Sequence, residues 1–190
     1  MNAPKKKKIV FVCTGNTCRS PMAEKLLDKA LKAQKLGGFT VTSAGTAAKR
    51  GDTINPNSAF VLQENGISVE TFKSKKITPA LLRDAFAIVC MTEKHRDYLM
   101  DMRWSVLRKS GVEDIENNVY SFAELTGSEV LDPYGKDIDC YRYVYALLAT
   151  GTPTLIEKLR LREHAIAPKK RGRPKKTEKI DENKSTENKE

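Results

Sequence analysis

Hydrophobic residues along this chain gather in short continuous runs and in longer stretches of helical spacing. A continuous run of β-branched and aromatic residues predicts a strand that is buried on both faces of a sheet. Residues 9–12 and 86–91 predict buried strands of this kind, and residues 39–42 and 119–122 predict two further strands. The strand at residues 39–42 is followed directly by Ser43-Ala44-Gly45.

Apolar residues spaced three or four apart predict helices between and after these strands. Ser20 is suited to cap the first helix and Pro21 to its first turn, and Gly37-Gly38 would end it. Gly151-Thr152-Pro153 is expected to interrupt the last helix. Strands that alternate with helices predict an α/β fold with a parallel sheet and helices on both faces. The predicted helices cover residues 20–36, 57–64, 79–83, 93–109 and 139–161.

Length and composition indicate one folded domain with an appended tail. The chain has 190 residues, of which 39% are hydrophobic, enough for one ordinary core. Residues 168–190 consist mainly of charged and polar residues, and Ile180 is their only large apolar residue. Such a segment buries too little apolar surface to offset its chain entropy. We therefore expect a domain over residues 8–165 and a disordered basic tail over residues 168–190.

The net charge of +10 comes mostly from the two ends of the chain. Residues 5–8 are four lysines and residues 168–190 carry a surplus of four positive charges, which leaves about +2 between them. No apolar run approaches the ~18 residues that span a bilayer, and the first run is shorter than the ~7–15 residues of a signal peptide. Four cysteines do not make a disulfide framework. We expect a cytoplasmic protein with reduced thiols and no membrane partner.

The segment Cys13-Thr14-Gly15-Asn16-Thr17-Cys18-Arg19-Ser20 lies between the first predicted strand and the first predicted helix. Backbone N–H groups of such a loop and of the helix N-terminus favour a phosphate-like anion. Arg19 offers a planar fork for two of its oxygens. The same positive surroundings favour the thiolate of Cys13, which is the nucleophilic form. Gly15 is expected to supply a backbone conformation closed to larger residues, Asn16 to brace the loop, and Ser20 to hydrogen-bond the sulfur.

The stretch Val12-Cys13-Thr14-Gly15-Asn16-Thr17-Cys18-Arg19-Ser20-Pro21-Met22-Ala23-Glu24 resembles the signature of the low-molecular-weight protein tyrosine phosphatases, in particular their bacterial protein-arginine phosphatase branch. The resemblance continues at Ser43-Ala44-Gly45 and at residues 130–135. It implies a four-stranded parallel sheet and phosphorylated proteins as substrates. It also implies a phosphocysteine intermediate on Cys13 and hydrolysis without a metal or cofactor. The candidate substrate-binding residues are Thr14, Gly15, Asn16, Thr17, Cys18, Ser20 and Tyr134.

The expulsion of a poor leaving group requires a general acid. The resemblance assigns this role to Asp132, with Pro133 stiffening the turn and Tyr134 lining the pocket wall. Taken alone, an Asp-Pro pair indicates only a turn. The nearby Asp137 and Asp139 are interpreted as a solvated turn and a helix N-terminal charge, with contact to a guanidinium as the alternative.

Thr17 bears on the choice of substrate. Members of the family that act on phosphotyrosine resemble this loop but usually have Ile or Leu there, where an apolar side chain packs on the phenol ring. A smaller polar threonine suits a guanidinium and a water molecule, and the arginine-phosphatase branch resembles this chain at that position. Asp132 would pair with the guanidinium and protonate its nitrogen. The prediction is therefore a phosphoarginine phosphatase, with a phosphotyrosine phosphatase as the alternative.

The other cysteines and the two histidines carry weaker predictions. Cys18 either forms a reversible disulfide with Cys13 or is a small buried residue that fills the loop. Cys90 lies in an apolar strand, and Cys140 lacks an activating neighbour. Neither belongs to a close pair of downstream cysteines, and the thioredoxin-coupled arsenate reductases are expected to have such a pair. This argues against an arsenate reductase. The spacing of cysteines and histidines indicates no metal site. The two histidines, His95 and His164, are expected to be exposed.

Within the tail, Arg171-Gly172-Arg173-Pro174 resembles an AT-hook. Arginines suit a narrow A·T minor groove, and glycine lets the backbone approach its floor. Weak binding to AT-rich DNA or to another polyanion is one interpretation, and a solvated basic tail is the other. A DNA-associated module with an inactive body is a further alternative, against which the intact set of Cys13, Arg19 and Asp132 argues.

Overall fold

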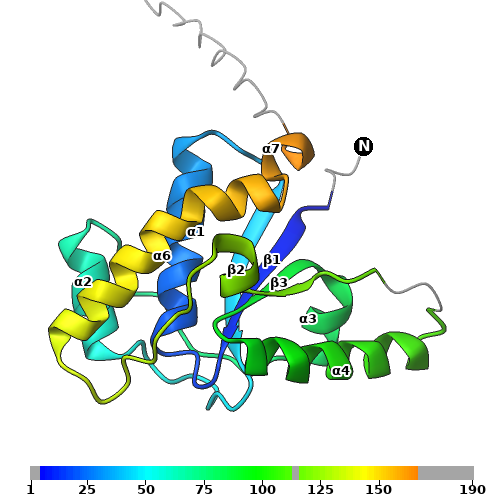
Figure 1. Ribbon diagram of the computed structural model, residues 1–190, viewed down its shortest axis with the longest axis horizontal. Helices are drawn as coiled ribbons and strands as arrows, with labels where there is room; N and C mark the ends of the chain where they lie inside the picture. The colour runs from blue at the N-terminus through cyan, green and yellow to red at the C-terminus, as the bar shows by residue number, and fades with distance from the viewer. Residues whose placement is uncertain (1–4, 113–115, 167–190) are drawn as a thin grey trace, which may run out of the picture.

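The computed structural model describes residues 5–112 and 116–166, which form a four-stranded parallel sheet between two layers of helices (Figure 1). All three strand pairs are parallel, and the strand order is β2-β1-β3-β4. The predicted α/β fold is confirmed. The strands are β1 (Lys7–Cys13), β2 (Phe39–Gly45), β3 (Ala85–Cys90) and β4 (Val119–Ser121).

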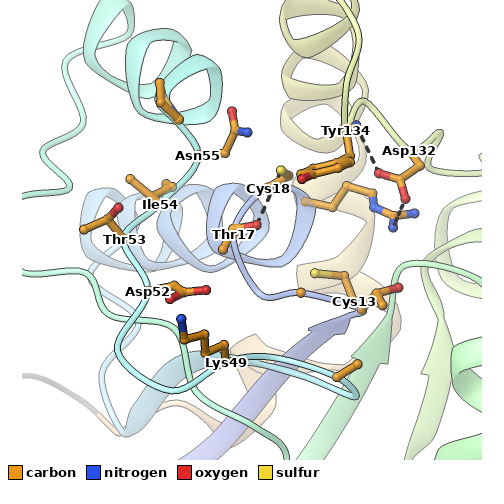
Figure 2. A pocket seen from close by; sticks show the side chains of 15 residues that line it. Cys13, Thr17, Cys18, Lys49, Asp52, Thr53, Ile54, Asn55, Asp132 and Tyr134 are labelled. Atoms are coloured by element: carbon orange, nitrogen blue, oxygen red, sulfur yellow. Dashed lines mark hydrogen bonds and ion pairs between the residues drawn. The ribbon is translucent and has the colours of Figure 1, made fainter.

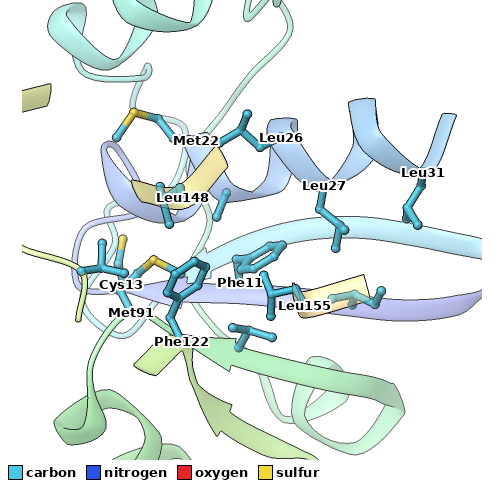
Figure 3. Close-up of a cluster of buried hydrophobic side chains, with 14 of the residues drawn as sticks. Phe11, Cys13, Met22, Leu26, Leu27, Leu31, Met91, Phe122, Leu148 and Leu155 are labelled. Carbon is cyan, nitrogen blue, oxygen red and sulfur yellow. The ribbon is translucent and has the colours of Figure 1, made fainter. Parts of the chain in front are cut away.

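The central strand β1 explains the two layers, because its side chains alternate between the faces of the sheet. Ile9 and Phe11 face a cluster that contains apolar residues of α1 (Arg19–Ala33) and α6 (Ile138–Lys158), part of which is seen in Figure 3. Val10 and Val12 face a second cluster with Leu82 of α3 (Pro79–Asp84) and Leu99 of α4 (Glu93–Lys109). All four residues of this run are fully buried, as the continuous apolar run predicts.

Three further helices complete the described fold: α2 (Pro56–Glu64), α5 (Phe122–Thr126) and α7 (Leu161–His164). The fourth strand is one residue shorter than predicted, because Ser121 caps α5 in a capping box with Glu124. The prediction that Ser20 caps α1 is wrong. That helix begins at Arg19, with Cys18 in the N-cap position, and Ser20 is fully buried within its first turn.

The last long helix, α6, is continuous through Gly151-Thr152-Pro153, so the predicted interruption is wrong. The reason is tertiary packing. The glycine lies against the buried ring of Phe122, where any Cβ would be 2.5 Å from the ring carbon Cζ. Buried Leu148 and Leu155 hold the helix against the core on either side of the proline. Burial of these turns outweighs the low helix propensity of Gly and Pro.

We expect Gly151→Ala to lower the free energy of unfolding by about 1–3 kcal/mol, because overpacking strains a close-packed core. The added methyl group would force the Phe122 ring, 2.5 Å away, to move. Urea denaturation followed by circular dichroism measures the change. Thr150→Ala, at the neighbouring, more exposed position, is the control and should be neutral or slightly stabilising. A more stable Gly151→Ala protein would show that helix propensity governs this position.

Two predictions from the sequence concern the ends of the chain. The AT-hook-like residues 171–174 lie outside the described residues, and the boundaries 8–165 and 168–190 stay predictions. Among the residues that the structure describes, no helix combines the length and apolar character needed to cross a membrane.

Candidate active site

The candidate site lies at the carboxyl ends of β1 and β3, the edge where parallel sheets bind ligands beside a reversal of strand order. β2 and β3 lie on opposite sides of β1, so the order reverses there. The segment from Cys13 to Ser20 joins β1 to α1 at this edge. The fold therefore places the thiol at the end of a buried strand, beside the N-terminus of a 15-residue helix.

Asn16 determines the path of this loop. It is fully buried and has a positive φ of 54°, a left-handed conformation that Asn tolerates better than most residues. Its Nδ2 donates to the hydroxyls of Ser20 (3.0 Å) and Ser43 (2.8 Å), and its Oδ1 accepts from the Lys75 N–H (2.9 Å). The prediction for Gly15 is wrong, since Gly15 has no positive φ and Asn16 takes the left-handed position.

The end of β2 supports the loop from the other side. Gly45 approaches it so closely that a Cβ would lie 2.4 Å from the carbonyl oxygen of Thr14 and 2.8 Å from Ala48 Cβ. The following residues are tied to the loop through backbone bonds, in which Ala47 N–H donates to Thr14 and Asn55 N–H donates to Thr17. A glycine at the end of β2 is therefore required by this close approach.

Cys13 is 3% exposed, and its Sγ lies 3.0 Å from the Ser20 hydroxyl. Ser20 accepts a hydrogen bond from Asn16, and its single hydroxyl hydrogen has two acceptors within reach. These are the Cys13 sulfur at 3.0 Å and the Ala44 carbonyl at 3.5 Å, of which the sulfur is the nearer. The serine that was expected to cap the helix therefore contacts the candidate nucleophile instead.

Arg19 lies beside the thiol with its side chain 6% exposed. Its Nη2 donates to Asp132 Oδ2 at 2.7 Å, and the Tyr134 N–H donates to the other oxygen of this carboxylate at 3.2 Å. The guanidinium Nε is buried and has no hydrogen-bond partner within the described part of the chain. An unpaired buried donor of a charged group is costly. This donor indicates an acceptor ligand, and an anion fits its charge.

A cavity of about 600 Å³ opens over the thiol (Figure 2). Its floor is the loop after β1, and Asp132 and Tyr134 form one wall. Asn16 and Ser20 do not line it and lie behind the loop as supports. The other candidate substrate-binding residues all line it: Thr14, Gly15, Thr17, Cys18 and Tyr134.

The opposite wall comes from the segment between β2 and α2, which the sequence did not reveal. Lys49, Asp52 and Ile54 line the cavity there (Figure 2). The cavity thus has two carboxylates on opposite walls, Asp52 and Asp132. No motif in this segment signals a site, and its position follows only from the hydrogen bonds to the loop.

The predicted exposure is wrong for His95, which is partly buried, and it is confirmed for His164. The ring of His95 bonds Thr14 Oγ1 through Nε2 at 2.9 Å and Thr92 Oγ1 through Nδ1 at 2.7 Å. Burial lowers the pKa of His95, the nearby Arg19 lowers it further, and Asp132 acts in the opposite direction. A neutral ring thus contacts the loop from α4.

Cys18 and Cys90 are both buried, and burial raises the pKa of each thiol. Cys90 lies in the core beneath α4, as predicted. Cys18 lies 3.8 Å from the Tyr141 hydroxyl, and its disulfide with Cys13 stays a prediction.

The two carboxylates beyond Asp132 have structural contacts. Asp137 caps α6 by accepting from the Cys140 N–H at 3.0 Å, and Asp139 pairs with Arg142 at 3.0 Å. Both lie at the N-terminus of α6, where negative charge is favourable. This agrees with their interpretation as turn and helix-end charges, and the guanidinium that Asp139 contacts is that of Arg142 within the same helix.

Comparison with known proteins decides the family. Residues 8–165 match the family described as low molecular weight phosphotyrosine protein phosphatase. The chain belongs to this family. The resemblance drawn from the Cys13–Ser20 segment is confirmed.

Its relatives in this family carry two names. A protein-arginine-phosphatase of Geobacillus stearothermophilus is 34% identical over 152 residues, which cover 80% of this chain and 95% of the relative. A probable low molecular weight protein-tyrosine-phosphatase, AmsI of Erwinia amylovora, is 30% identical and covers 80% and 96%. A solved structure of the YwlE arginine phosphatase, a cysteine-to-serine mutant with a phosphorylated active-site serine, has a TM-score of 0.70 and 31% identity over 80% of this chain and 95% of that one.

Proposed function

We propose that this chain is a protein phosphatase that hydrolyses phosphoarginine in proteins, with Cys13 as nucleophile, Arg19 as phosphoryl anchor and Asp132 as general acid. The observation that carries the proposal is the buried Arg19 guanidinium, whose Nε has no hydrogen-bond partner among the described residues. Arg19 lines the same cavity as Cys13 and Asp132. These are the three groups that a thiol-dependent phosphoryl transfer needs.

The reaction has two steps. Asp132 takes up a proton from solvent once the phosphoryl dianion has replaced it on Arg19. The Cys13 thiolate then attacks phosphorus, the P–N bond breaks, and Asp132 gives its proton to the departing guanidinium nitrogen. A phosphocysteine remains. Asp132, now a carboxylate, takes a proton from a water molecule that attacks the phosphorus, and the S–P bond breaks to release inorganic phosphate and the thiolate. The loop N–H groups, the α1 N-terminus and Arg19 stabilise the charge on the phosphoryl oxygens throughout.

The Arg19–Asp132 contact couples binding to catalysis. A phosphoryl dianion competes for the same guanidinium that now bonds Asp132 at 2.7 Å. Asp132 is half exposed, so its release toward the leaving group needs little rearrangement. The bond from the Tyr134 N–H keeps the carboxylate at the cavity wall as it changes partner.

Two features favour phosphoarginine as the substrate. Thr17, rather than a larger apolar residue, lies at the cavity floor, and carboxylates line two walls. A guanidinium carries positive charge and N–H donors, so it gains from carboxylates that a phenol ring does not use. The relative named protein-arginine-phosphatase supports this assignment. Phosphotyrosine is the alternative, supported by the exposed aromatic ring of Tyr134 at the entrance and by the relative AmsI.

Hydrolysis of matched phosphoarginine and phosphotyrosine peptides by the purified chain tests the substrate. We expect a higher kcat/KM on phosphoarginine. A preference for phosphotyrosine would overturn the substrate and leave the nucleophile and acid in place. A lack of activity on both would overturn the proposal as a whole.

We expect Thr17→Ile to shift the preference toward phosphotyrosine by roughly tenfold or more, because added apolar volume favours a ring and crowds a hydrated guanidinium. The ratio of the two kcat/KM values measures the shift. Thr17→Val is the matched control, since it removes the hydroxyl at nearly constant volume. An unchanged ratio in the isoleucine variant would show that Thr17 does not discriminate between the substrates.

A further inference from the structure

The start of α4 reaches the loop that follows β1 because of the sheet register. Val12 of β1 pairs with Cys90 of β3, and the Met91 N–H donates to the Val12 carbonyl at 2.8 Å. The two chain segments therefore leave the sheet side by side, one into the loop and one into α4. Thr92 caps α4, and His95 lies in its first turn.

His95 joins α4 to the loop through two side-chain bonds. Its Nδ1 lies 2.7 Å from Thr92 Oγ1, and its Nε2 lies 2.9 Å from Thr14 Oγ1. Thr14 follows the nucleophile directly and lines the cavity. Because both ring nitrogens are held, the imidazole has a defined orientation.

The hydrogen-bond partners of the ring favour one tautomer. Thr92 Oγ1 accepts the His95 backbone N–H at 3.3 Å as a helix cap, which leaves its single hydroxyl hydrogen for Nδ1. With Nδ1 as the acceptor, a neutral ring carries its proton on Nε2 and donates it to Thr14 Oγ1. The hydroxyl hydrogen of Thr14 is then available to a group in the cavity.

The electrostatics favour the neutral ring. Burial lowers the pKa of His95, and Arg19 across the loop acts in the same direction, whereas the Asp132 carboxylate opposes it. The ring is therefore neutral at neutral pH and retains one acceptor and one donor.

We propose that His95 is a positioning residue: in its Nε2–H form it fixes the Thr14 hydroxyl as a hydrogen-bond donor to the phosphoryl group in the cavity. The chain of donors runs from Thr92 through His95 and Thr14 to a phosphoryl oxygen. This rests on the proposed phosphatase function, but it concerns the phosphoryl group and not the arginine or tyrosine side chain that carries it.

Imidazole nitrogen NMR tests the assignment directly, because the chain has only two histidines. His164→Gln removes the second set of signals and changes an exposed residue of α7. We expect the His95 spectrum to show Nε2 protonated and Nδ1 unprotonated, with a titration midpoint below its usual 6.5. Protonation at Nδ1 would overturn the proposal, because Thr14 would then donate to the ring rather than to the ligand.

Binding of orthovanadate, a phosphate analogue, tests the role of the contact. His95→Leu should weaken this binding by about tenfold or more, the worth of one hydrogen bond to a charged ligand held in place. His95→Gln should restore most of it, because an amide N–H reaches the position of Nε2. Equal loss in both variants would overturn the proposal and leave His95 with a packing role.

A double-mutant cycle separates positioning from general stability. If His95 acts through the Thr14 hydroxyl, Thr14→Val combined with His95→Leu should bind orthovanadate no more weakly than Thr14→Val alone. Additive losses would contradict this pathway. Because the readout is vanadate binding, it is unaffected if the enzyme prefers phosphotyrosine. Failure of the proposed chemistry would instead appear as full activity of a Cys13 variant.

Discussion

Cys13→Ser is expected to lower turnover of any phosphorylated substrate by at least about 10⁴-fold, because loss of the nucleophile disables the whole catalytic unit. The structure gives the reason. Cys13 is 3% exposed at the end of β1, and the Ser20 hydroxyl lies 3.0 Å from its sulfur. A hydroxyl at this position ionises far less readily than a thiol, and an alkoxide is a poor leaving group for the second step.

The serine variant has a second expected outcome. If slow attack occurs, the phosphoryl group should remain on residue 13, since its release would require loss of an alkoxide. Intact-mass measurement after incubation with a phosphoarginine peptide detects the added group. The solved structure of the YwlE cysteine-to-serine mutant contains such a phosphorylated active-site serine. Cys13→Ala lacks an acceptor atom and should show no added mass.

The matched control is Cys140→Ser, which changes a cysteine at the start of α6 that does not line the cavity. It should retain wild-type kcat and KM. Full activity of Cys13→Ser would end the mechanism, and a phosphoryl group found on another residue would move the nucleophile there.

The sequence predicted the parts of the fold that depend on local pattern. The continuous apolar run of residues 9–12 marked the central strand, and the residue types of the segment Cys13–Ser20 were enough to locate the loop that forms the cavity floor. Asp132 lies 113 residues from Arg19 in sequence, and the family resemblance alone linked the two. The sequence thus predicts features that depend on neighbouring residues, and it predicts a contact between distant residues only where a family signature contains both.

What the sequence did not predict depends on contacts between distant segments. Gly151 reads as a helix breaker until the Phe122 ring is found against it. His95 reads as an exposed helical residue until the register of β1 and β3 places it beside Thr14. The cavity wall that contains Asp52 has no sequence motif. Its position depends on backbone hydrogen bonds that other residues of the same segment donate to the loop after β1.

Asp132→Asn is expected to lower kcat by about 10²–10⁴-fold, the usual contribution of a general acid, while orthovanadate binding is kept or becomes tighter. An amide cannot deliver the proton that the departing nitrogen needs. The substitution also removes the ion pair with Arg19, now 2.7 Å long, so the guanidinium becomes more available to an anion. The variant should therefore turn over substrate more slowly while it binds orthovanadate at least as tightly. A variant that had simply unfolded would lose both turnover and binding.

Substrates with different leaving groups test whether Asp132 supplies the proton. p-Nitrophenyl phosphate releases a stable phenolate and needs little protonation, so the asparagine variant should lose less activity on it than on a phosphotyrosine or phosphoarginine peptide. Asp139→Asn, at an exposed carboxylate that pairs with Arg142, is the control and should behave as the wild type on all three substrates. An equal loss on good and poor leaving groups would mean that Asp132 positions Arg19 and does not supply the proton. In that case another carboxylate of the cavity, of which Asp52 on the opposite wall is the candidate, would be the acid.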